Sequence, residues 1–290
     1  MRAFAFIALI CVTAIWGYTF VVVRDAVRIY PVVPFLSLRF GFAALLLSPL
    51  LLRGRTDLRA GVLPGVALGA GYLTQTFGLK YTTASQAGLL TGLFVVITPV
   101  MELAIYRVKP RHVTIVAVAV AFAGTALLAA PGGLAPGSLQ LAGDGLEILT
   151  AFAFSIHLLL LGRVTRGRDS GQLAFAQIAI AALGFSIGAT ALKGYPRPTA
   201  EVWTALLITA GLATAPAFWI QTRVQQYLSP SRTALVLVLE PAFATLFGFL
   251  LAGDSFTRVQ AVGAALILLA IVGHESVAAL RPLPSRLGET

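Results

Sequence analysis

Residues 233–252 read TALVLVLEPAFATLFGFLLA, a stretch of twenty residues in which Glu240 is the single charged side chain. A run of about 20 apolar residues is long enough to cross a bilayer as a helix. Pro241, which directly follows Glu240, has no N–H, so the carbonyl of Leu237 loses its helical hydrogen-bond partner. The sequence therefore predicts a membrane span that is interrupted where it carries charge.

The whole chain has this apolar character, with 58% hydrophobic and 11% charged residues, whereas soluble domains carry roughly 25% charged residues. The apolar runs are much longer than the roughly ten residues of membrane barrel strands, and they lack a two-residue alternation. We therefore predict an all-α membrane protein with ten transmembrane helices, over residues 3–23, 32–52, 60–80, 84–106, 112–130, 144–162, 171–192, 201–226, 231–252 and 258–279.

The basic residues predict the orientation of these spans. Of the 21 Lys and Arg residues, fourteen fall on one side of the expected bundle and six on the other, and Arg39 falls within a span. An excess of basic residues marks the cytoplasmic side, so both termini are expected in the cytoplasm. The net charge of +10 is then a basic rim facing anionic lipid, and no nucleic-acid partner is expected.

The chain also repeats itself. Residues 72–85 (YLTQTFGLKYTTAS) and 218–231 (FWIQTRVQQYLSPS) share Gln, Thr, Tyr and Ser at a constant offset of 146. Each segment leads into an apolar run that holds a proline, Pro99 or Pro241, and these two prolines match at an offset of 142. We therefore divide the chain into residues 1–133, residues 134–280 and a cytoplasmic tail 281–290, with the Gly/Pro-rich residues 131–137 as the seam.

Five spans in each half is an odd number, so the second half must insert upside down relative to the first. Such inverted repeats are the architecture of many secondary transporters, whose two halves rock around a site at the middle of the membrane. At an offset of 138, the front of each half aligns more loosely, with Trp16 opposite Phe154 and Arg39 opposite Gln177.

Several short motifs resemble the drug/metabolite transporter superfamily, and specifically its ten-helix EamA family. They are Ile15-Trp16-Gly17, Arg39-Phe40, Gln75 with Tyr81, Leu239-Glu240-Pro241 and Gly253-Asp254, where many members have Gly-Glu. The resemblance implies an exporter or facilitator of small metabolites in a prokaryotic inner membrane. It does not name the solute.

The ionisable residues within spans are the first candidates for a substrate cavity. Glu240 lies near the middle of its span, where a charge costs about 2.5–3.5 kcal/mol on insertion scales. It could contact solute, carry a proton, or bond neighbouring helix ends around the proline. Arg39 suits a carboxylate or could anchor helices, and His157 could carry protons or pack as a neutral side chain.

Neutral polar and aromatic residues complete the expected cavity: Trp16, Gln75, Gln177, Trp219 and Gln221. The amides could equally form hydrogen bonds between helices. Pro99 and Pro241 are expected to mark helix breaks that act as hinges. The glycines Gly61, Gly65 and Gly69 recur at every fourth residue, which predicts close packing of the third span.

We therefore expect a secondary transporter of small organic solutes, with amino acids or related amphipathic molecules favoured, working by alternating access. A proton-coupled drug efflux carrier is the alternative, and the coupling ion, if any, stays open. An intramembrane enzyme or a purely structural membrane protein is disfavoured because only isolated polar residues occur and because the halves repeat. With one cysteine, Cys11, and no phosphate-binding loop or dinucleotide motif, we expect no cofactor and no metal. The oligomeric state is left undecided.

Overall fold

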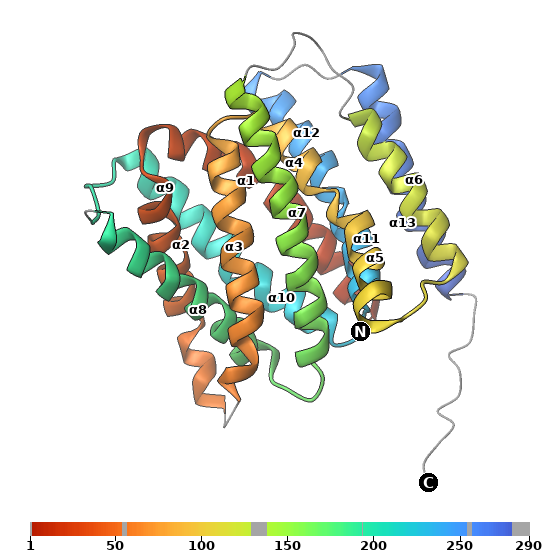
Figure 1. The fold of residues 1–290 in the computed structure, drawn as a ribbon, viewed down its shortest axis with the longest axis horizontal. Coiled ribbons are helices and arrows are strands. Elements are labelled where there is room, and N and C mark those ends of the chain that lie inside the picture. The colour runs from red at the N-terminus through yellow and green to blue at the C-terminus, as the bar shows by residue number, and fades with distance from the viewer. Residues whose placement is uncertain (1, 54–56, 129–137, 193, 254–256, 280–290) are drawn as a thin grey trace.

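The structure is a computed structural model that describes residues 2–53, 57–128, 138–192, 194–253 and 257–279. Every regular element within those residues is helical (Figure 1). In chain order the elements are α1 (Arg2–Ile29), α2 (Val32–Leu47), η1 (Ser48–Arg53), η2 (Leu58–Gly61), α3 (Val62–Leu79), α4 (Ala84–Thr91), α5 (Phe94–Tyr106), α6 (His112–Leu128), α7 (Ser138–Val164), α8 (Ser170–Ala191), α9 (Ala200–Ile208), η3 (Thr209–Thr214), α10 (Ala215–Gln225), α11 (Pro230–Leu237), α12 (Leu239–Ala252) and α13 (Arg258–Ala279).

Within the described residues, seven helical segments are long and apolar enough to cross a membrane, so the chain is an all-helical, multi-pass membrane protein. They are Phe6–Ile29, Val32–Leu52, Ala84–Tyr106, Leu139–Val164, Ser170–Ala191, Ala200–Gln225 and Pro230–Leu251. Two further apolar helices are shorter, His112–Leu127 and Arg258–His274. The 18-residue helix α3 has a length of about 27 Å at 1.5 Å per residue.

Three features of the sequence lie outside the described residues. They are Asp254 of the Gly-Asp motif, the seam at 131–137 and the tail 281–290. Among the helices, α1 and α7 are longer than expected, because α1 continues to Ile29 and α7 begins at Ser138.

The most extensive helix contacts join one half of the chain to the other. Helix α3 packs along α7, α6 along α13, α2 along α8, and α1 along α12. In Figure 1, α6 and α13 lie as a pair at one side of the bundle. The two halves thus pack against one another through these helix pairs.

Close packing of α3 through its glycines is confirmed. A Cβ atom on Gly65 would lie 2.7 Å from the carbonyl oxygen of Gln177 in α8, and one on Gly61 would lie 2.4 Å from the Cβ of Ala176. At Gly69 the nearest atom, the Cβ of Ala181, is 3.5 Å away. The third expected span therefore approaches α8 most closely at its first two glycines, Gly61 at the end of η2 and Gly65 in α3.

Both helices that carry the expected breaks are interrupted, but the first break is not at the proline. The span 84–106 is interrupted between α4 and α5, at Gly92 and Leu93, and α5 continues through Pro99. The N–H of Val96 bonds the carbonyl of Leu93 at 3.0 Å, a three-residue spacing that tightens the chain here. The cause lies in packing, because Gly92 contacts the ring of Pro241, whose Cγ would be 2.5 Å from an added Cβ.

The second break follows the expectation from the proline more closely. Helix α11 ends at Leu237, whose carbonyl has no N–H partner at Pro241, and α12 begins at Leu239. Counted along the repeat, Val238 lies 146 residues after Gly92. The breaks are therefore equivalent under the offset of 146, whereas Pro99 lies one helical turn deeper than Pro241.

The turns that precede these breaks have the same backbone hydrogen bonds in both halves. Tyr81 N–H bonds Gly78 O at 2.9 Å, and Tyr227 N–H bonds Val224 O at 2.9 Å. Each following helix is capped by a hydroxyl, that of Thr83 in α4 and that of Ser229 in α11. Figure 1 places the α3–α4 turn and the α10–α11 turn toward opposite ends of the bundle. The same turn bond and the same kind of hydroxyl cap thus occur in both halves.

The glycine contact gives a first test. In Gly65→Ala the new methyl would meet backbone atoms of α8, so we expect a loss of about 1–3 kcal/mol, as in other overpacked interiors, seen as a lower unfolding temperature in detergent. The matched control is Gly41→Ala in α2, where nothing lies within 4 Å of the added Cβ. Equal unfolding temperatures for the two variants would contradict the packing described here.

Candidate substrate cavity

A small cavity of about 30 Å³ lies where the two halves meet. Seven helices contribute to it: α1, α3, α5, α7, α10, α11 and α12. Its lining residues are Trp16, Tyr72, Gln75, Phe94, Phe154, His157, Leu158, Phe218, Gln221, Leu237 and Glu240. Both helix breaks contribute, Phe94 just after the first and Leu237 just before the second.

A second hollow of about 20 Å³ adjoins the first. The two share the side chains of Trp16, Tyr72, Gln75 and Glu240. The second adds Arg39 of α2 together with Thr19, Phe20, Val23 and Leu79. One continuous lining therefore carries both a carboxyl group and a guanidinium group.

Six of the eight residues expected to line a cavity do lie on one of the two hollows. These are Trp16, Arg39, Gln75, His157, Gln221 and Glu240. Gln177 lies behind the wall, where its Oε1 accepts a hydrogen bond of 2.6 Å from His157 Nε2 and its Nε2 donates to Thr222 Oγ1 at 2.9 Å. Trp219 belongs to neither lining, and its Nε1 donates to Ser170 Oγ of α8 at 3.3 Å.

Aromatic rings form much of the wall. Trp16 lies 5.3 Å from Phe218 between ring centroids, and Tyr72 lies 5.5 Å from Phe154 and 5.9 Å from Phe218. The rings meet edge-on or tilted, the arrangements that aromatic pairs prefer. These contacts span the two halves and give the cavity an apolar wall.

The two charged residues of the lining are almost fully buried and do not pair with one another. Arg39 is 2% exposed and Glu240 is 6% exposed. Arg39 Nε donates to Thr214 Oγ1 at 2.8 Å, its Nη2 lies 3.4 Å from the Tyr72 hydroxyl, and its Cζ lies 4.6 Å from the centre of the Tyr72 ring. Among the described residues neither Arg39 nor Glu240 forms an ion pair.

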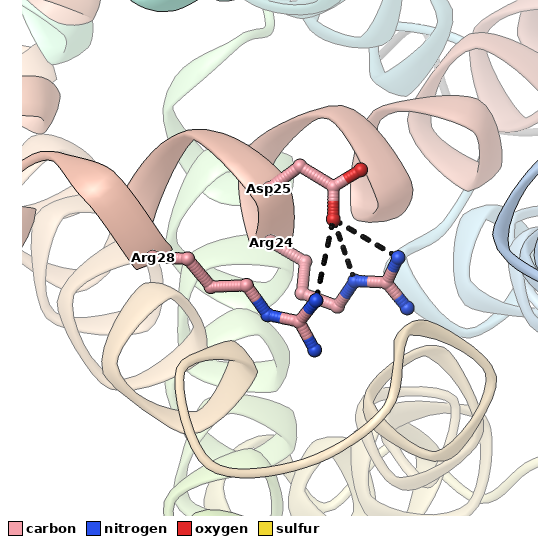
Figure 2. A network of polar contacts seen from close by, with 3 residues as sticks. All are labelled: Arg24, Asp25 and Arg28. Atoms are coloured by element: carbon pink, nitrogen blue, oxygen red, sulfur yellow. Dashed lines mark hydrogen bonds and ion pairs between the residues drawn. The ribbon is translucent and has the colours of Figure 1, made fainter.

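A different arginine of the same region is paired. Arg24, one residue beyond Val23 of the second hollow, contacts Asp25 Oδ1 at 2.9 Å through Nη2, and Arg28 approaches the same oxygen at 3.9 Å. Figure 2 shows the carboxylate of Asp25 between the two guanidinium groups at the end of α1. Arg24 thus has a carboxylate partner, whereas Arg39, deeper in the bundle, faces the hollow without one.

The π-helix η3 is the feature of the site that the sequence analysis missed. Its widened turn ends at Thr214, whose hydroxyl donates to Thr209 O at 2.8 Å and accepts from Arg39. The carbonyl of Ala213 accepts the indole N–H of Trp16 at 2.7 Å. Pro216, just after η3, is the signal that could have identified this irregular backbone.

Two further acids lie in the interior of the bundle or at its edge. Glu102 of α5 accepts a hydrogen bond from the Ser231 hydroxyl at the start of α11. Glu147 of α7 was not singled out, yet it is fully buried and accepts a hydrogen bond from Thr91 Oγ1 at 2.9 Å.

The Trp16 contact can be tested through stability. In Trp16→Phe the Ala213 carbonyl keeps its burial and loses its donor, which costs about 1–3 kcal/mol. We expect a lower unfolding temperature by circular dichroism. The matched control is Trp203→Phe, because Trp203 is 41% exposed on the outer surface. Identical shifts for the two variants would mean that the indole N–H does not hold η3.

Known proteins resemble this chain over most of its length. The model of the "EamA-like transporter family" matches twice, over residues 3–130 and 141–274. A protein from Archaeoglobus fulgidus named "Uncharacterized transporter" is 34% identical over 272 residues, which are 93% of this chain and 85% of the relative. A second of that name from the same organism is 25% identical over 196 residues, covering 66% of this chain and 67% of the relative.

A protein of known crystal structure shares the fold. It superposes with a TM-score of 0.72 and 20% sequence identity over 97% of this chain and 98% of its own.

Proposed function

Since this chain belongs to the EamA-like transporter family, we propose that it carries small zwitterionic solutes, amino acids above all, through the cavity between its halves. The observation that carries this proposal is the pair of unpaired opposite charges, Arg39 and Glu240, on one continuous lining. A carboxylate group would bond Arg39, and an ammonium group would bond Glu240. The aromatic wall would hold an apolar side chain.

We further propose that the ten helical spans form two inverted five-helix repeats, residues 1–133 and 134–280. The double family match, the recurring turn at an offset of 146 and the equivalent breaks at Gly92 and Val238 support this. An even number of crossings puts both termini on one side, and the basic loops favour the cytoplasm of a prokaryotic cell.

Inverted repeats provide a means of alternating access. Because the most extensive contacts run between the halves, tilting one half against the other would open the cavity first to one face and then to the other. The tight contacts of Gly17 and Gly88 with α12 are the proposed pivots. The breaks at Gly92 and Val238 would act as hinges beside the solute.

Counterflow in proteoliposomes tests the proposal. Vesicles loaded with unlabelled phenylalanine and leucine should accumulate the labelled amino acids transiently and saturably. A channel would show neither saturation nor acceleration by solute on the far side. Absence of accumulation for every amino acid offered would contradict the proposal.

The charge assignment has its own test. A hydrogen bond to a charged group contributes about 1.5–3 kcal/mol, so Arg39→Gln should lower amino-acid counterflow about tenfold to a hundredfold. Amine analogues that lack the carboxylate should be poor solutes, and Arg39→Gln should leave their rates unchanged. Glu240→Gln should show the reverse pattern, with N-acetyl amino acids as the insensitive solutes.

The control for these variants is Arg223→Gln, because Arg223 lies exposed at the end of α10 and bonds Gln226. A loss that is equal for amino acids and amines would mean that Arg39 stabilises the fold without contacting solute.

Drug efflux coupled to protons is the second candidate, favoured by the aromatic wall beside Glu240. Cations stack on aromatic faces, but Arg39 on the same lining would repel them. Transport of a cationic dye that depends on Glu240 and is insensitive to Arg39→Gln would favour this candidate over amino-acid transport.

A further inference from the structure

Glu147 is a buried carboxyl group that does not line the cavity. It lies on α7 with no exposed surface. Its Oε2 accepts from the Thr91 hydroxyl at 2.9 Å, and its Oε1 has no hydrogen-bond partner among the described residues. A carboxylate would leave half of its negative charge on an oxygen without any donor.

The charged groups around Glu147 do not neutralise it. On its own helix, Asp144 lies one turn away, and Glu240 of α12 is the acid that acts on Glu147 from across the interior. The neighbouring helices α3 and α4 carry no charged side chain within their bounds, and Lys80, the residue after α3, is exposed. Glu102 of α5, Arg223 of α10 and Arg232 of α11 lie toward the opposite end of α7, where Gly162 meets Pro230.

A short polar chain connects Glu147 with the cavity. Gln75, which lines both hollows, lies 3.5 Å from the Thr91 hydroxyl through its Nε2, and that hydroxyl donates to Glu147. Toward the beginning of α7, the half-exposed Asp144 accepts a hydrogen bond of 2.9 Å from Thr82. Glu147 thus lies between the solute cavity and an acid at the end of the bundle.

The carboxyl packs closely against α3. Oε1 faces Gly78, where an added Cβ atom would lie only 2.5 Å from it. Burying an unpaired charge costs several kcal/mol, and a neutral carboxylic acid avoids that cost.

We propose that Glu147 is a proton-binding site that couples proton movement to transport. In the conformation described here one proton occupies Oε1, and Oε2 accepts from Thr91. When the halves tilt and water reaches the carboxyl, the O–H bond of Glu147 breaks and the proton passes to that water. No other covalent bond is made or broken. This inference rests on the proposed transport function for its role in the cycle, whereas the protonation itself does not depend on any solute.

Infrared spectroscopy of the full chain in lipid vesicles tests the protonation directly. The wild type at neutral pH should give a C=O stretching band of a protonated carboxyl, and Glu147→Gln should lose it. Thr91→Val keeps the acid and removes its hydrogen bond, so the band should move to higher frequency. The matched control, Glu201→Gln on the exposed start of α9, should keep the wild-type band.

If Glu147→Gln fails to fold, the Thr91→Val variant still tests the proposal. A band that is unchanged in both variants would overturn the proposal, and so would its absence from the wild type at neutral pH.

Coupling is tested with a pH-sensitive dye sealed inside the vesicles. Addition of phenylalanine and leucine should change the internal pH in the wild type, and Glu147→Gln should retain amino-acid counterflow while losing the pH change. If no amino acid moves at all, the proposed function fails while the infrared result still decides the protonation. Counterflow accompanied by the same pH change in Glu147→Gln would show that the coupling proton binds elsewhere.

Discussion

A charge inside a membrane protein must be paired, neutral or in reach of water, because the surrounding lipid offers no compensation. Arg39 and Glu240 meet this requirement differently from the arginine at the end of α1. Arg24 has the carboxylate of Asp25, whereas Arg39 has only a hydroxyl, a phenol and an aromatic ring around it. Arg39 and Glu240 instead line the adjoining hollows.

Segments of irregular backbone lie beside the same hollows. Helix breaks and widened turns free carbonyl groups, and such groups are tolerated at membrane depth only where protein or water bonds them. The π-helix η3 illustrates the first case, since Trp16 bonds Ala213 and Arg39 bonds Thr214. The breaks at Gly92 and Val238 place Phe94, Leu237 and Glu240 on the cavity lining. Polar side chains and irregular backbone therefore stabilise one another at the interface between the halves.

The sequence predicted the all-helical membrane class well, because this class follows from apolar length and from the rarity of charge. The sequence predicted less well which interior face of a helix lines the cavity. Gln177 and Trp219 belong to neither hollow, and no single-chain pattern distinguishes one interior face of a helix from another. Glu147 was missed because α7 begins at Ser138, earlier than the hydropathy indicated, so the residue lies a full two turns into the helix. The break near Pro99 was misplaced because it depends on Gly92 packing against Pro241, a contact between residues far apart in the chain.

The central claim is that the cavity is reached by water from one side of the membrane at a time. Side-specific labelling of Leu237→Cys with a membrane-impermeant thiol reagent, in a Cys11→Ser background, measures this directly. Leu237 lines the cavity, and Ala244→Cys is the control, since Ala244 is fully buried where α12 packs against Gly17 and Gly88. The account predicts that Leu237→Cys reacts from one face, that transported solute changes its rate, and that Ala244→Cys does not react. Labelling of Leu237→Cys from neither face, or equally from both faces whether or not solute is present, would contradict it.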